Sequence, residues 1–156
     1  MRVEFVDTSI LVELLDVPDR NANRESVSSE LADKRRAHVH LILPTAAVIE
    51  TGNHIHHVKD GTARHRCAKA FAQVLRLTAE GEAPWTLFES MWDGAFLTAV
   101  REGAGTATGI VEHFVAQSLS CGDLSVIAER DVYRSRVAKT TDVGIWTLDA
   151  AMKAWA

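Results

Sequence analysis

Short apolar runs alternate along this chain with longer segments of helical periodicity, and this alternation restricts the fold more than any other feature. The runs cover residues 3–6, 38–43 and 143–147, and apolar residues at helical spacing follow each of them. A strand can pair in parallel with the next one only through a long crossover connection, and a helix provides that connection. Strands separated by helices are therefore typical of parallel pairing. The pattern therefore predicts an α/β sandwich around a largely parallel sheet.

Further helical segments are expected between and after these runs. They begin near residues 10, 45, 62, 84, 110 and 121, and others end at residues 34–36 and at the end of the chain. The helix expected from Pro84 has an apolar stripe, which Gly103 ends. This stripe consists of Phe88, Met91, Trp92, Ala95, Phe96 and Val100. Its aromatic residues keep helical spacing, which favours a core or dimer surface over a platform for stacking bases.

The composition is that of one folded domain covering residues 1–156. Apolar residues make up 47% and charged residues 24%, which excludes a disordered chain. No apolar run approaches the roughly 20 residues of a membrane span, and the charged N-terminus has no secretory core. Cys67 and Cys121 lack the spacing of a disulfide framework or zinc knuckle. We therefore expect a cytoplasmic protein without a membrane partner.

Four acids occupy related places in this pattern. Asp7 directly follows the first apolar run and Asp149 directly follows the last, while Glu50 lies in the helix after the second run. Asp123 opens a late helix. Ligands of open α/β sheets bind outside the carboxyl ends of the strands. We therefore expect the four carboxylates to share one cleft.

Carboxylates gathered in one cleft repel one another unless a cation offsets their charge. Mg²⁺ and Mn²⁺ are bound by carboxylate oxygens, water and phosphate oxygens. Such an ion activates a water and neutralises charge on a phosphodiester, and two ions about 4 Å apart would serve both the attacking and the leaving oxygen. No set of His and Cys has the spacing of a structural zinc site.

Each acid also has a purely structural interpretation. Asp7 and Asp123 could cap the helices that they precede or open, and Asp149 could be a turn residue. Glu50 could lie at the edge of its helix. The joint placement of the four favours a functional site.

The same residues resemble a known family. The segment at 6–12, VDTSILV, resembles the start of PIN-domain ribonucleases, in particular the VapC-like toxins of bacterial toxin–antitoxin pairs. The segments PTAAVIETGN at 44–53, GDLSVIA at 122–128 and IWTLD at 145–149 are similar to the family's three later acidic positions. The four segments span nearly the whole chain and keep the family's order.

This resemblance implies a PIN-like three-layer sandwich and a Mg²⁺-dependent endoribonuclease, with Mn²⁺ as an alternative ion. It implies that Asp7, Glu50, Asp123 and Asp149 bind the metal and act in catalysis, with Thr8, Ser9, Asn53 and Thr147 as supporting residues. The implied partners are RNA, a second copy of the chain and an antitoxin that covers the acidic cleft of this type II toxin. The alternative is a degenerate PIN-like module that binds RNA or protein, but all four acids are present.

The chain departs from the family's pattern at residues 85–105 and 131–142, where it is longer than a compact member needs. The second of these segments ends at Asp142, which is an alternate fourth acid. We prefer Asp149 because it follows the last strand and has Thr147 two residues before it. Phosphotransfer domains fit less well, because Ser9 stands where a haloacid-dehalogenase-like phosphatase has a second aspartate and Asp7 lacks the acidic neighbour of a receiver domain.

Histidines and basic residues provide weaker signals. On a helix, Asn53, His54 and His57 share the face of Glu50, so Asn53 or His54 lies near the metal or a phosphate unless this face is merely solvated. His56 and His65 complete the cluster. Arg64, Arg66 and Lys69 are candidates for binding RNA. Other basic groups are either RNA contacts or solvated faces: Lys34, Arg35, Arg36, Arg76, Arg130, Arg134, Arg136 and Lys139.

Overall fold

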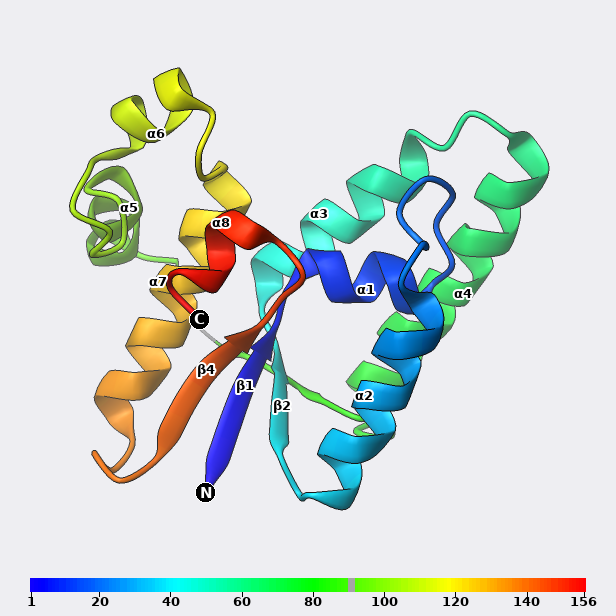
Figure 1. The fold of residues 1–156 in the computed structure, drawn as a ribbon, viewed down its shortest axis with the longest axis horizontal. Helices are drawn as coiled ribbons and strands as arrows, with labels where there is room; N and C mark the ends of the chain where they lie inside the picture. The colour runs from blue at the N-terminus through cyan, green and yellow to red at the C-terminus, as the bar shows by residue number, and fades with distance from the viewer. Residues whose placement is uncertain (90–91) are drawn as a thin grey trace.

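A computed structural model describes residues 1–89 and 92–156. Its sheet contains β1 (Arg2–Val6), β2 (His40–Leu43), β3 (Thr86–Leu87) and β4 (Asp142–Trp146), in the order β3-β2-β1-β4 (Figure 1). All three pairings are parallel. The helices are α1 (Thr8–Leu14), α2 (Arg24–Arg36), α3 (Thr45–His56), α4 (Gly61–Ala79), α5 (Gly94–Arg101), α6 (Ile110–Ala116), α7 (Cys121–Arg136) and α8 (Ala150–Lys153).

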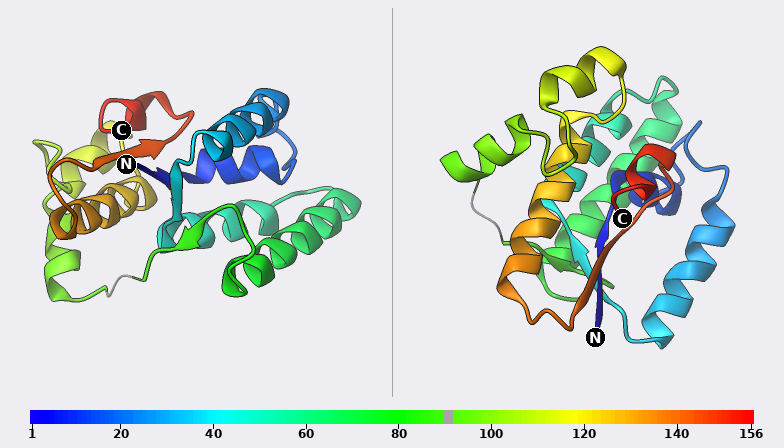
Figure 2. Two further views of the ribbon diagram at one scale, coloured as in Figure 1. Left: turned by 90° about the horizontal axis from the view of Figure 1, so that it is seen from below. Right: turned by 60° about the vertical axis from the view of Figure 1, so that its left-hand side comes forward.

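Helices cover both faces of this sheet (Figures 1 and 2). Val3 and Phe5 of β1 point to one face, where they pack with residues of α5 and α7 such as Phe96 and Leu124. Val6 points to the other face and packs with residues of α1 and α2. Successive side chains of a strand alternate between faces, so a strand covered on both sides is apolar nearly throughout. The predicted α/β three-layer sandwich with a parallel sheet is confirmed.

The segment after Pro84 does not form the predicted helix. Thr86 and Leu87 instead form the edge strand β3, and the amide of Phe88 donates to the carbonyl of Leu43 at 3.0 Å. Helix α5 begins only at Gly94, where the side chain of Asp93 accepts from the amide of Phe96 at 2.9 Å. Met91, which was predicted on the apolar stripe, lies outside the described residues. The other elements differ from prediction by a few residues; β2, for example, begins at His40 because His38 has a φ of 55°.

A buried carboxylate joins the helices α3 and α7. Glu129 of α7 is fully buried, and its side chain accepts from the amide of Thr45 at 3.1 Å and from the indole of Trp92 at 2.9 Å. Thr45 is the first residue of α3, whose N-cap provides no side-chain acceptor. Burial raises the pKa of Glu129. This contact fixes the start of α3 against the middle of α7.

Within the two described stretches, no helix has the length and apolar character needed to span a bilayer.

Candidate metal centre

The four predicted acids line one cavity at the carboxyl ends of β1 and β4. Asp7 follows β1, and its amide donates to the carbonyl of Trp146, the last residue of β4, at 3.0 Å. Asp149 precedes α8, Glu50 lies in the middle of α3, and Asp123 lies in the first turn of α7. The cavity has a volume of about 320 Å³, and its other lining residues are Thr8, Ser9, Val12, Arg20, His54 and Ser120.

Two hydroxyl groups hold the side chain of Asp7. Ser9 Oγ and Thr147 Oγ1 each donate to Asp7 Oδ2 at 2.8 Å. Ser9 is itself fixed, because its Oγ accepts from the amide of Leu148 at 3.0 Å. Asp7 is only 3% exposed, yet its side chain makes no capping bond to α1. Asp7 therefore stands at the N-cap of α1 without the predicted side-chain capping bond, and its Oδ1 has no hydrogen-bond partner among the described residues.

Glu50 is placed by a hydroxyl group and a glycine. Thr8 Oγ1 donates to Glu50 Oε2 at 3.0 Å. The carboxyl group lies directly over Gly122, where an added Cβ would stand 2.0 Å from Glu50 Cδ. Only glycine leaves this space, so Gly122 lets the start of α7 approach Glu50.

Asp123 and Asp149 do act as helix caps. Asp123 and Ser120 form a capping box, in which the Ser120 amide donates to Asp123 Oδ2 at 2.9 Å. Asp149 Oδ1 accepts from the amide of Ala151 at 2.9 Å. These bonds hold one oxygen of each carboxylate at a helix start and aim both side chains toward the cavity.

The four acids share their cavity with one arginine, Arg20, but form no ion pair with it. Among the described residues, no ion pair includes any of the four. Burial raises the pKa of Glu50, and the charges of Asp123 and Asp7 raise it further. Burial also raises the pKa of Asp123, to which Asp7 and Asp149 contribute. A cation in this cavity would relieve both the desolvation and the repulsion.

The donor set fits a hard divalent cation, although the side chains do not converge on one point. In residues 1–89 and 92–156, no group of three or more acids, histidines or cysteines stands close enough to hold a metal ion. Bonds to Thr8, Ser120 and Ala151 hold oxygens of Glu50, Asp123 and Asp149 apart. The available ligands are carboxylate oxygens, which Mg²⁺ and Mn²⁺ prefer.

The alternate fourth acid lies elsewhere. Asp142 is the first residue of β4, is exposed, and has its amide bonded to the carbonyl of Met1. Its carboxylate stands 3.8 Å from the guanidinium of Arg2. This is the amino end of the parallel strands, opposite to Asp7, so the geometry places Asp149 and not Asp142 beside the other acids.

The structure places the two predicted residues of α3 differently with respect to the cavity. His54 lines the cavity, and burial lowers its pKa, with smaller contributions from Arg20 and His57. Asn53 is exposed and does not line the cavity, and its carbonyl bonds to His57 Nδ1 at 2.7 Å. A supporting role for Asn53 stays a prediction that this arrangement does not favour.

Most of the basic candidates have structural partners. Arg64 donates to the carbonyl of Val58 at 2.7 Å, and Arg66 pairs with Asp16 at 3.1 Å. Lys69 is exposed on α4. None of the three lines the acidic cavity. That they bind RNA stays a prediction.

Three of the other basic residues form ion pairs or hydrogen bonds with groups of the fold itself. Lys34 pairs with the buried Glu4 at 2.6 Å, and Arg130 is buried with its guanidinium bonded to the carbonyl of Trp155 at 2.7 Å. Arg134 donates to the carbonyl of Val143.

Sequence reasoning missed three residues of the site: Arg20, Ser120 and Gly122. The spacing of Ser120 and Asp123 is that of a capping box, which was a usable signal. The role of Gly122 depends on its distance from Glu50, and the position of Arg20 depends on a loop, so neither has a local signature.

The chain matches no protein-family model, and a search of curated proteins finds no match. A proposal for the function therefore rests on the geometry and chemistry of the cavity and on the resemblance of the four acidic segments.

The raised pKa of Glu50 predicts a pH-dependent effect of the substitution Glu50→Gln in metal-free protein. Ionised Glu50 costs stability, because its pKa is higher in the folded than in the unfolded state. This cost is absent below the ordinary value of 4.5 and is complete once the pH exceeds the raised pKa. Glu50→Gln should therefore melt at a higher temperature than wild type at neutral pH, and the difference should vanish below pH 4.5.

Thermal unfolding in EDTA across this pH range measures the effect. Glu82→Gln is the matched control, since Glu82 is exposed and lines no part of the acidic cavity. A lower melting temperature for Glu50→Gln at neutral pH would show that the carboxylate stabilises the fold instead of straining it.

Proposed function

We propose that this protein is a metal-dependent endoribonuclease of the PIN-domain type, which hydrolyses RNA phosphodiester bonds with Mg²⁺ or Mn²⁺. One observation carries the proposal: carboxylates from four separate segments line a single cavity without a cationic ion-pair partner among the described residues. Structural acids of a folded protein are usually paired or solvated, whereas these are partly buried together.

The residues that would hold the ion are Asp7, Glu50, Asp123 and Asp149. When bound, the ion lowers the pKa of a coordinated water and neutralises charge that develops on the phosphate. Ser9 and Thr147 bond to the same oxygen of Asp7, so they orient the carboxylate and leave its second oxygen free. Thr8 does the same for Glu50 through Oε2. These hydroxyl groups set ligand geometry before the ion arrives.

The resemblance extends the proposal to a biological role. VapC-like toxins are inhibited by an antitoxin that covers the acidic cleft, and we propose the same arrangement here, in a cytoplasmic homodimer. A short reading frame directly upstream that encodes a DNA-binding N-terminus would support this role.

Two measurements on the wild-type protein test the proposed activity. Isothermal titration of Mn²⁺ should give saturable binding. Incubation with RNA and Mg²⁺ should give internal cleavage that EDTA stops and excess Mg²⁺ restores. RNA that is bound but stays intact at saturating metal would contradict the nuclease and favour the degenerate binding module.

A further inference from the structure

A second cavity adjoins the acidic one. It has a volume of about 440 Å³ and lies between the loop that joins α1 to α2 and the segment that follows α3. Arg20 and His54 line both cavities. They therefore stand where a ligand that fills the acidic cavity would continue into the second one.

Arg20 brings an exposed positive charge to this junction. Within the described part of the chain, its guanidinium has neither an ion-pair nor a hydrogen-bond partner, although four carboxylates line the cavity that it borders. Lys59 of the second cavity adds another positive charge. The same cavity also has two acids, Asp19 and Asp60, of which Asp60 accepts from the amide of Ala63 at 2.7 Å, so its lining has two charges of each sign.

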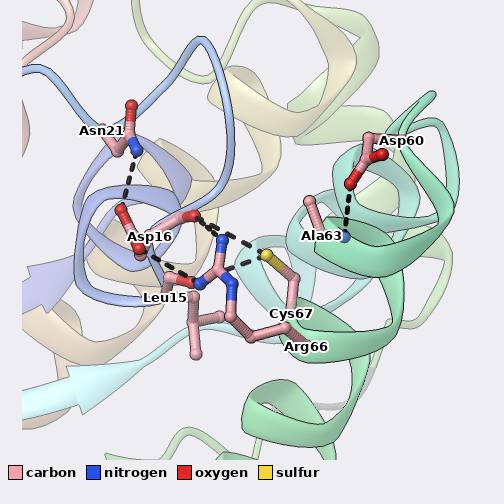
Figure 3. Close-up of polar contacts among 7 residues, drawn as sticks. All are labelled: Leu15, Asp16, Asn21, Asp60, Ala63, Arg66 and Cys67. Atoms are coloured by element: carbon pink, nitrogen blue, oxygen red, sulfur yellow. Dashed lines mark hydrogen bonds and ion pairs between the residues drawn. The ribbon is translucent and has the colours of Figure 1, made fainter.

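The loop that carries Arg20 is fastened on its N-terminal side. The carboxylate of Asp16 accepts from Asn21 Nδ2 at 2.7 Å and pairs with Arg66 at 3.1 Å (Figure 3). Arg66 also donates to the carbonyl of Asp16 at 2.9 Å, and the thiol of Cys67 contacts the same oxygen at 3.6 Å. Arg66, which the sequence suggested as an RNA contact, thus ties this loop to α4.

The C-terminal side of the loop is fastened as well. Glu13 of α1 is buried, and its carboxylate accepts from the amide of Asn23 at 2.9 Å and from Asn23 Nδ2 at 3.2 Å. Arg20 is therefore held between two fixed points. A fixed loop has little backbone freedom left to lose when it binds a ligand, so the remaining entropic cost is that of ordering the arginine side chain.

We propose that Arg20 binds a backbone phosphate of the RNA strand next to the one that is cleaved, so that the strand runs from the acidic cavity past His54 into the second cavity. This inference rests on the proposed function, and it names the path of the substrate. A guanidinium offers the paired donors that match a phosphate, and it would offset repulsion between the RNA and the acids. His54, which lines both cavities, would form the wall of this path.

The test compares Arg20→Gln with Arg101→Gln, both in the Asp7→Asn background that prevents cleavage. Arg101 is exposed on α5, its one ion pair with a described residue is to its neighbour Glu102 at 3.4 Å, and its substitution removes the same charge. Fluorescence anisotropy with a labelled single-stranded RNA of mixed sequence gives the affinity at several salt concentrations. Arg20→Gln should lower the affinity about tenfold, as expected for one charged hydrogen-bonded contact. It should also reduce the slope of log K against log salt by about 0.7. Arg20→Lys should keep the slope.

Two further readouts separate the failure of this inference from the failure of the proposed function. Mn²⁺ titration of the single variant Arg20→Gln should show binding as tight as wild type or tighter, because a positive charge near the carboxylates has gone. The Arg20→Gln enzyme should cleave RNA with a raised KM. If wild type binds no Mn²⁺ and cleaves no RNA, the proposed function fails. If wild type cleaves while Arg20→Gln and Arg101→Gln bind RNA equally, only the phosphate contact is overturned.

Discussion

Asp7→Asn should reduce Mg²⁺-dependent RNA cleavage at least about 100-fold, since several kcal/mol of charge stabilisation depend on the ion that this carboxylate would hold. Asparagine has nearly the same volume and still accepts hydrogen bonds from Ser9 and Thr147, so the local structure is kept while the charge is lost. Mn²⁺ binding, measured by isothermal titration, should weaken in parallel. Asp123→Asn should have the same effect on cleavage.

The control for Asp7→Asn is Asp33→Asn, which removes one negative charge from an exposed position on α2. It should cleave RNA at the wild-type rate and bind Mn²⁺ unchanged. Cleavage by Asp7→Asn at the wild-type rate would reject the catalytic role. A folded, stable Asp7→Asn protein that has lost both activities would separate this role from a structural one.

Gly122→Ala is expected to lower the rate of cleavage at least about tenfold without unfolding the protein. A tenfold loss corresponds to a rise of about 1.4 kcal/mol in the activation free energy. The new Cβ would stand 2.0 Å from both Cδ and Oε1 of Glu50. These atoms are at the end of a flexible side chain, so the carboxyl group moves while the two helices stay in place. Alanine favours a helix interior over glycine by roughly 0.5–1 kcal/mol and the second residue of α7 by less than this, so the free energy of unfolding should stay the same or rise slightly.

Activity and stability should therefore change in opposite directions, or activity alone should change. The matched control is Gly94→Ala in the first turn of α5, where an added Cβ would meet nothing within 4 Å. It should leave cleavage unchanged. Full activity in Gly122→Ala would mean that Glu50 does not act from its position over Gly122.

The sheet and the placement of the acids around one cavity were predictable because both follow from local pattern. A strand buried on two faces is apolar throughout, as at Phe5 and Val6, and the residue that follows it lies at the ligand-binding edge. Asp7 and Asp149 are placed by this rule alone. The preference for Asp149 over the alternate Asp142 also rested on local pattern, since Asp142 begins β4 and Asp149 comes after its end.

The region after Pro84 was mispredicted because its pattern fits two structures. Phe88, Trp92 and Phe96 have helical spacing, yet Phe88 and Phe96 are buried from separate elements, on either side of residues that the structure does not describe. Strand β3 has only two residues, both exposed, so it lacks an apolar signature. Its pairing with β2 is a tertiary contact, and tertiary contacts override weak local preference.

The contacts around the second cavity could not be predicted for a related reason. Asp16 and Arg66 are far apart in the sequence, and an arginine on a helix surface is usually solvated. Gly122 likewise shows its role only through its approach to Glu50. In each of these cases the role of the residue depends on a contact with a residue far away in the sequence, and local pattern does not reveal such a contact.

The hydrogen bond from the first residue of α3 to the buried Glu129 of α7 restricts how these two helices can move past each other. Sliding α3 along α7 would break the bond from the Thr45 amide to the buried Glu129, so this contact holds the helix of Glu50 and the helix of Asp123 in one relative position.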